Sequence, residues 1–130
     1  MVGLVIVSHS RLLAEGVREL AGQMAPTVRI VPAGGAPDGD LGSDVERIAA
    51  ALEAAWDGDG VLVLADLGSA IMSAHLAIEA QPPERRPRLV LSPAPLVEGA
   101  VVAAVEAALG RDLATVAAAA LAARDFPKHV

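Results

Sequence analysis

The feature that most constrains this chain is a short apolar run that ends at a histidine flanked by two serines. Leu4-Val5-Ile6-Val7 has no polar face and is rich in β-branched residues, which is typical of a central parallel strand covered on both sides. In folds built from such strands, ligands bind just beyond the carboxyl ends of the strands. Ser8, His9 and Ser10 follow the run directly. We therefore expect the His9 imidazole to lie at the functional edge of a sheet.

A second apolar run, Val61–Ala65, is likewise followed at once by an ionisable residue, Asp66. Shorter strands are predicted at 28–31 and 89–91, helices at 11–24, 45–56, 70–80, about 99–109 and 113–124, and a Gly- and Pro-rich loop at 32–42. The expected helix N-caps are Ser10, Ser43 or Asp44, Ser69 and Asp112. This alternation predicts a single α/β domain over residues 1–130, with a mainly parallel four-stranded sheet of order 2-1-3-4 and helices on both faces.

The composition excludes several classes of function. A formal net charge of -6, with arginines clustered only at 85–88, argues against a nucleic-acid partner. The chain has no cysteine, which excludes thiolate nucleophiles, disulfides and Cys-based metal sites. The Ala-rich segment 113–123 is too short to cross a bilayer, where about 20 apolar residues are needed. We expect a cytoplasmic protein with no membrane partner.

A sheet of order 2-1-3-4 makes the first and third strands neighbours and opens a crevice between His9 and Asp66. A carboxylate that accepts from one imidazole N–H fixes the tautomer and leaves the other nitrogen unprotonated. We expect Asp66 to accept from His9 Nδ1–H, with Nε2 as the reactive atom. The turn at Gly68 and Ser69 offers backbone N–H groups to an anion. Hydroxyl donors come from Ser8, Ser10 and Ser69. Such neutral donors suit a phosphoryl group that must bind and leave again.

Three segments together resemble a known family: Val5–Ser10, Asp66–Ala70 and Ala94–Ala100. They resemble the DhaM-type phosphotransferase subunits of bacterial dihydroxyacetone kinase. The domain of those subunits is similar to the mannose-family IIA components of the phosphoenolpyruvate:sugar phosphotransferase system. The resemblance covers nearly the whole chain. The third segment, in this order and spacing, favours the DhaM branch over the sugar-transporting relatives.

This resemblance implies a phosphoryl relay. The phosphocarrier protein HPr would phosphorylate His9, oriented by Asp66, and the group would pass to ADP bound on the DhaL subunit. The regenerated ATP would phosphorylate dihydroxyacetone held by DhaK, so the chain itself would bind no cofactor or metal directly. Ser10, Gly68 and Ser69 would contact the phosphoryl group, and the site would be bordered by Ser8 and by a loop containing Pro95, Leu96 and Glu98. The family is typically dimeric, and the Ala-rich C-terminal helices are candidates for the interface.

Three other functions compete with this interpretation. The start of the chain, with His75 further on, is similar to small CbiX-type metal chelatases, in which His9 and His75 would be metal ligands. Against this, the glycine usual after the first histidine is Ser10 here, and His75 lies within a predicted helix. A sugar-transporting IIA component of the mannose family is the second alternative. A non-catalytic regulatory module that binds an anion at Gly68 and Ser69 is the third.

Overall fold

Four parallel strands form the central layer of the structure, a computed structural model that describes residues 1–129. The strands are β1 (Gly3–Ser8), β2 (Ile30–Gly34), β3 (Val61–Ala65) and β4 (Leu89–Ser92). Their order in the sheet is β2-β1-β3-β4, and the three pairings are parallel. The predicted fold class and strand order are therefore confirmed.

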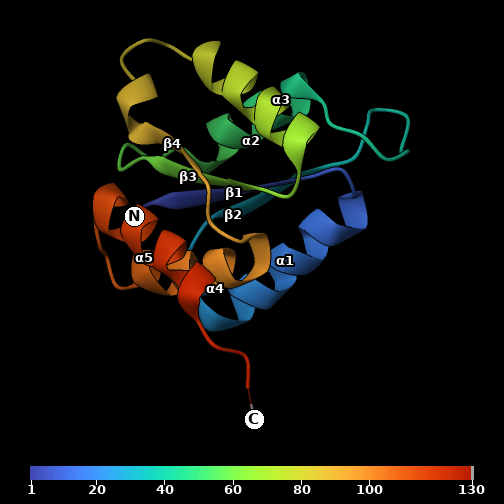
Figure 1. Ribbon diagram of the computed structural model, residues 1–130. Coiled ribbons are helices and arrows are strands. Elements are labelled where there is room, and N and C mark those ends of the chain that lie inside the picture. Colours follow the sequence, from blue (N-terminus) through green and yellow to red (C-terminus); the bar gives the residue numbers. More distant parts are fainter. Residues whose placement is uncertain (130) are drawn as a thin grey trace.

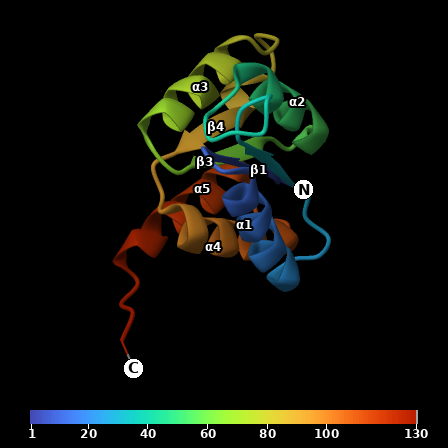
Figure 2. The ribbon, with the colours of Figure 1, turned by 90° about the vertical axis from the view of Figure 1, so that its right-hand side faces the viewer.

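Helices cover both faces of this sheet (Figure 1 and Figure 2). One face carries α1 (Arg11–Met24), α4 (Leu96–Ala108) and α5 (Leu113–Ala122), and the other carries α2 (Val45–Ala55) and α3 (Gly68–Glu79). Short 3₁₀ turns at Arg86–Arg88 and Ala123–Asp125 precede β4 and follow α5. Within residues 1–129, no helix is long and apolar enough to span a bilayer.

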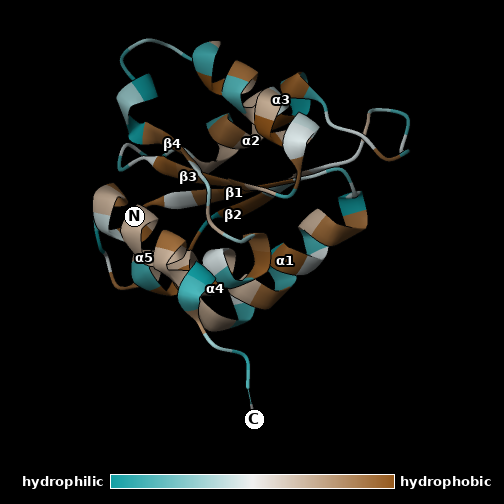
Figure 3. Ribbon diagram, in the orientation of Figure 1, coloured by the Kyte–Doolittle hydropathy of each residue, from teal (hydrophilic) through white to brown (hydrophobic). Residues whose placement is uncertain are grey.

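The two central strands send alternate side chains into two aliphatic cores, and these strands are the most uniformly apolar part of Figure 3. Toward α1, α4 and α5 point Leu4, Ile6, Leu62 and Leu64, and toward α2 and α3 point Val5, Val7, Val61 and Val63. The inner face of α4 is made of glycine and alanine, all buried. A Cβ at Gly99 would stand 2.9 Å from the Ala94 Cβ. Small residues thus allow α4 to pack closely on the sheet.

Strand β2 begins two residues later and ends three residues later than predicted. It covers Ile30–Gly34 where the sequence indicated 28–31, and so includes the start of the predicted loop. The register explains the difference, because β2 pairs with β1 residue by residue until Ser8 lies opposite Gly34. Pro32 is tolerated there because β2 is an edge strand with a neighbour on one side only.

Two helices begin earlier than predicted. Helix α3 starts at Gly68 instead of residue 70, so Ser69 lies inside its first turn and Leu67 takes the N-cap position. Helix α4 starts at Leu96, with Pro95 as its N-cap. The prediction of a loop was wrong for residues 96–98, which are helical, while Pro95 lies outside the helix. The fixed φ of proline suits a helix start, and Gly99 serves close packing instead of beginning the helix.

The remaining helix starts agree with the sequence. The side chains of Ser10, Asp44 and Asp112 each accept a hydrogen bond from a backbone N–H three residues on. Each side chain thereby satisfies one of the N–H groups that a helix start leaves without a partner. The cap at Ser10 fixes the direction in which the chain leaves β1, immediately after His9.

Candidate active site

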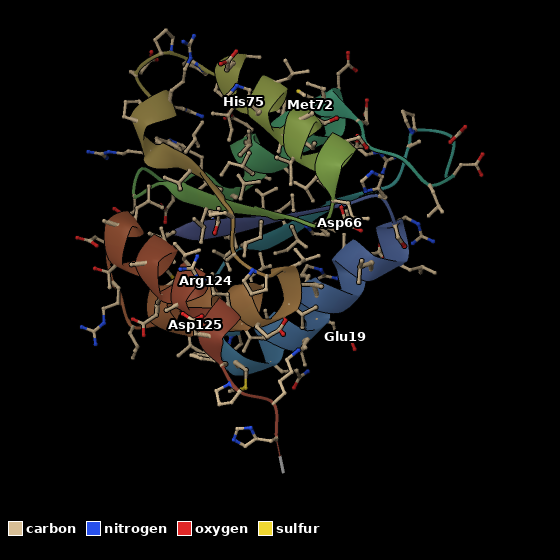
Figure 4. The ribbon with its side chains drawn as sticks, viewed as in Figure 1. Glu19, Asp66, Met72, His75, Arg124 and Asp125 are labelled. Atoms are coloured by element: carbon tan, nitrogen blue, oxygen red, sulfur yellow. The ribbon has the colours of Figure 1, made fainter. Side chains whose placement is uncertain are left out.

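The register of β1 against β3 brings His9 and Asp66 together. The last paired residues are Val7 and Ala65, and the Asp66 N–H extends the ladder by donating to the Val7 carbonyl at 3.2 Å. Both strands then leave the sheet at the same edge, one toward α1 and the other toward α3. Figure 4 shows the Asp66 side chain at this edge, where α1 and α3 begin.

The Asp66 carboxylate accepts hydrogen bonds on both oxygens. Oδ1 accepts from His9 Nδ1 at 2.9 Å and from the Leu67 N–H at 2.7 Å. Oδ2 accepts from the Ser8 hydroxyl at 2.8 Å and from the His9 backbone N–H at 3.0 Å. The Asp66 side chain is only 12% exposed. The two groups that the sequence analysis expected to pair, the His9 ring and the Asp66 carboxylate, are within hydrogen-bonding distance.

These donors also determine the protonation of the pair. Burial raises the pKa of Asp66, but hydrogen bonds from the His9 N–H, the Ser8 hydroxyl and the His9 ring outweigh burial and lower the pKa below its ordinary value. Asp66 is therefore a carboxylate at neutral pH and can only accept, so the proton between it and Nδ1 belongs to the ring. In the neutral imidazole, Nε2 then carries a lone pair and no proton.

Ser69, in the first turn of α3, faces that lone pair. Its Oγ lies 2.5 Å from His9 Nε2, and the hydroxyl is the donor because Nε2 is an acceptor in this tautomer. The His9 side chain is 28% exposed, so the ring is accessible from solvent. The first N–H groups of α3, beginning at Gly68, have no carbonyl partner within the helix and form its positive end. An anion bound to Nε2 would meet neutral donors there.

The two serines beside His9 have structural partners. Ser8 is fully buried, and its hydroxyl donates to Asp66 and accepts from the Ser10 N–H at 3.0 Å. The Ser10 hydroxyl accepts from the Leu13 N–H at 3.2 Å as the N-cap of α1. It keeps its own proton to donate, so the expected contact between Ser10 and a phosphoryl group stays a prediction.

The loop between β2 and α2 also reaches this site, which the sequence did not indicate. The Gly42 N–H donates to the His9 carbonyl at 2.9 Å. The Ser43 hydroxyl lies 2.7 Å from the Ser73 hydroxyl and 3.4 Å from the Ser69 carbonyl. The only signal in the sequence was richness in Gly and Pro, which predicts an irregular loop without giving its path.

The three residues predicted to border the site lie at the start of α4. Pro95 and Leu96 form the start of α4, and Glu98 in its first turn pairs with Lys128 of the C-terminal segment. Within residues 1–129, no hydrogen bond joins these residues to His9 or Asp66, and their place at the border of the site stays a prediction.

His75 does not lie beside His9. It pairs with Glu79 at 3.1 Å on the exposed side of α3, and Figure 4 shows it toward the far end of that helix from Asp66. Six residues separate His75 from Ser69, which corresponds to about 9 Å along the helix axis. The two histidine rings required by the chelatase alternative are therefore not brought together.

The sequence matches the EIIA-man family, described as the PTS system fructose IIA component, over residues 3–117. The chain belongs to this family of phosphotransferase-system IIA components, in agreement with the resemblance drawn from its motifs.

Three relatives similar to this chain are DhaM phosphoryl donor subunits. The chain is 47% identical over 120 residues to the DhaM phosphoryl donor subunit of PEP-dependent dihydroxyacetone kinase from Pantoea ananatis, and 46% identical over 117 residues to that from Escherichia coli. These matches cover 89% and 87% of this chain but 25% of each relative, so the chain spans about a quarter of their length. A DhaM subunit of Listeria innocua is 38% identical over 107 residues, which cover 82% of this chain and 86% of the relative.

Two solved structures have the same fold. A crystal structure of a protein of unknown function matches with a TM-score of 0.84 and 35% identity, covering 92% of each chain. The mannose/sorbose-specific IIA subunit of the phosphotransferase system from Enterococcus faecalis matches with a TM-score of 0.50 and 23% identity, covering 98% of each chain. At this identity the second match shows the fold alone.

Proposed function

We propose that this chain is a phosphocarrier domain of a PEP-dependent dihydroxyacetone kinase, which takes up a phosphoryl group on His9 and passes it on. The observation that carries the proposal is the His9 ring, hydrogen-bonded through Nδ1 to Asp66 and presenting Nε2 at the start of α3. The names of the DhaM relatives, as phosphoryl donor subunits, support the same function.

In the first transfer, the Nε2 lone pair attacks the phosphorus of a phosphohistidine on the donor protein, which we propose is HPr. The bond from Nε2 to phosphorus forms as the donor's N–P bond breaks, and the electron pair of that bond returns to the donor's imidazole. The His9 ring gains positive charge in this step. The Asp66 carboxylate, 2.9 Å from Nδ1, stabilises that charge without taking the proton.

In the second transfer, a terminal phosphate oxygen of ADP attacks the same phosphorus and the electron pair of the Nε2–P bond returns to Nε2. We infer that this ADP is held by the partner subunit DhaL and that DhaK holds the dihydroxyacetone that the ATP then phosphorylates. The chain itself would thus need no bound cofactor. Dividing one transfer from protein to nucleotide into two steps is the general advantage of a covalent intermediate.

The phosphoryl group on Nε2 would displace the Ser69 hydroxyl from that nitrogen, since its lone pair is then used in the N–P bond. We propose that Ser69, with the first N–H groups of α3 and the Ser10 hydroxyl, instead donates to the phosphoryl oxygens. These donors are neutral, so they stabilise the group without holding it as tightly as a lysine or arginine would. A carrier requires this property, because it must release the group to the next acceptor.

We also propose that the chain forms a homodimer, as the family resemblance implies. The inner alanines of α4 pack on the sheet, so an interface on the Ala-rich helices would have to use their outer faces. Analytical ultracentrifugation of the chain tests this part of the proposal by itself, with a monomer as the contradicting result.

The proposed function is tested by incubating the chain with labelled phosphoenolpyruvate, enzyme I and HPr. We expect label that is labile in acid and stable in alkali, as for a phosphohistidine, and that is absent in His9→Ala. Addition of DhaL and ADP should transfer the label to ATP. A wild-type chain that takes up no label from competent carriers would contradict the proposal. Label that reaches a sugar in place of ATP would favour the sugar-transporting alternative.

A further inference from the structure

Two successive residues of the β2–α2 loop contact the candidate site, one at His9 and the other at α3. The Gly42 N–H holds the His9 carbonyl at 2.9 Å. Ser43 turns toward α3, where its hydroxyl lies 2.7 Å from Ser73 Oγ and 3.4 Å from the Ser69 carbonyl oxygen. The Asp66 carboxylate joins the His9 ring to the Leu67 N–H at the N-cap of α3. Beyond that link, His9 and the first turn of α3 are joined directly between Nε2 and Ser69 Oγ and indirectly through this pair of loop residues.

The loop has internal hydrogen bonds that fix its shape. The Ala36 N–H donates to the Asp40 carbonyl at 2.9 Å, and the Gly39 N–H donates back to the Ala36 carbonyl at 3.0 Å. The Asp40 N–H also donates to the Asp38 side chain at 3.0 Å. Gly39 has a φ of +91°, a conformation that glycine adopts without strain. Ser43 follows this turn and contacts α3 through its own hydroxyl.

The two connections respond differently to phosphorylation. The direct connection depends on the Nε2 lone pair, which is consumed when the N–P bond forms, so the Ser69 hydroxyl must leave Nε2. The loop connection uses the His9 carbonyl, the Ser69 carbonyl and the Ser73 hydroxyl, none of which takes part in the transfer. Once His9 carries a phosphoryl group, Ser43 is the side chain that still ties the β2–α2 loop to the first turn of α3.

We propose that Ser43 is a positioning residue for phosphoryl transfer, which keeps the Ser69 hydroxyl and the first N–H groups of α3 facing the phosphoryl group on His9. The inference rests on the proposed function. Ser43 contacts no reacting atom and acts through Ser69 and Ser73. Loss of one hydrogen bond should slow transfer to and from His9 by about threefold to tenfold.

The first measurement needs no phosphoryl donor. In the ¹⁵N-labelled chain, Ser43→Ala should shift the His9 Nε2 signal and the amide signals of residues 68–70, because Ser69 is held less firmly. Ser43→Thr keeps a hydroxyl and should restore both sets of signals. Thr27→Ala removes an exposed hydroxyl in the connection between α1 and β2 and serves as the matched control. Unchanged signals in a folded Ser43→Ala chain would overturn the proposal.

The second measurement is the rate of label transfer from HPr to the same variants. We expect Ser43→Ala to be about threefold to tenfold slower than wild type, with Ser43→Thr and Thr27→Ala near the wild-type rate. Equal rates in wild type and Ser43→Ala, or a Ser43→Thr chain as slow as Ser43→Ala, would overturn the positioning role. If Ser43→Ala does not fold, Ser73→Ala removes the other hydroxyl of the pair and the same two measurements apply. A wild-type chain that takes up no label instead contradicts the proposed function, while the ¹⁵N result still decides whether Ser43 positions Ser69.

Discussion

Replacement of Asp66 by asparagine tests the arrangement of the candidate site most directly. The carboxylate accepts from four donors, two on each oxygen, whereas an amide has a single oxygen. Two of the donors are the backbone N–H groups of His9 and Leu67, which cannot become acceptors, and they approach different oxygens. In either orientation, therefore, the amide NH₂ faces one backbone N–H and leaves it without a partner.

The magnitude follows from this loss. A hydrogen bond to a charged group contributes about 1.5–3 kcal/mol, so Asp66→Asn should lower the free energy of unfolding by about 2–3 kcal/mol at neutral pH. The effect on the transfer barrier should be at least as large. If the NH₂ faces His9 Nδ1, the ring proton moves to Nε2 and the attacking lone pair is lost. If the amide oxygen faces Nδ1, the negative charge that stabilises the ring is lost. We expect the transfer rate to fall by about a hundredfold or more.

The assay is rapid-quench measurement of label transfer from phosphorylated HPr, with urea unfolding of the same preparations. Asp112→Asn is the matched control, since it makes the same chemical change at the N-cap of α5, where asparagine caps about as well as aspartate. Asp112→Asn should transfer at the wild-type rate. A folded Asp66→Asn chain with the wild-type rate would refute the reasoning, and so would equal slowing in both variants.

Three further predictions concern pH, packing and the second histidine. The fold lowers the pKa of Asp66, so the stability that ionised Asp66 contributes is complete above the ordinary carboxyl pKa of about 4 and is lost as the pH falls through the pKa of the folded state. In urea unfolding as a function of pH, the free energy of unfolding should therefore fall less steeply toward low pH in Asp66→Asn than in wild type. Gly34→Ala should destabilise the fold by about 3 kcal/mol or prevent folding, because the added Cβ would stand 2.6 Å from the Ser10 carbonyl oxygen. Gly16→Ala is the control in thermal melts and should not destabilise the fold, because a Cβ there would have nothing within 4 Å. His75→Ala should still take up the acid-labile label. Loss of the label in this variant would show that the exposed His75 ring takes part in the transfer.

The sequence predicted those parts of the fold that depend on apolar patterning. Val61–Ala65 is a continuous apolar run with turn residues on both sides, and the observed strand has the predicted bounds. Helix α1 also begins and ends at the predicted residues, because the Ser10 cap and the apolar spacing point to the same segment. The convergence of His9 and Asp66 followed from strand order alone, since adjacent parallel strands end at the same edge of a sheet.

Features that depend on contacts between distant segments could not be predicted. Ser69 is a residue type that favours the N-cap position, yet its hydroxyl bonds to His9 Nε2. The helix begins at Gly68, two residues before the predicted start. The sequence predicts a helix start at about Gly99, but this residue lies inside α4, where close packing on Leu64 and Ala94 requires a glycine. The contact of Ser43 with α3 depends on the path of an irregular loop, which local sequence rules do not specify.

The separation of His9 and Asp66 along the chain has a consequence for the study of folding. The two residues are 57 positions apart and meet only when β3 has paired with β1 in the correct register. A nascent chain that ends before β3 has the histidine but not yet the carboxylate. A partly refolded chain in which β3 has not paired with β1 has both residues, but they lie apart. Under the proposed function, the fraction of molecules that take up label would count those that have completed the central strand pairing. Helix content measured by circular dichroism does not report that quantity. Under the proposed function, label uptake on His9 would therefore report the rate at which the sheet forms in refolding experiments.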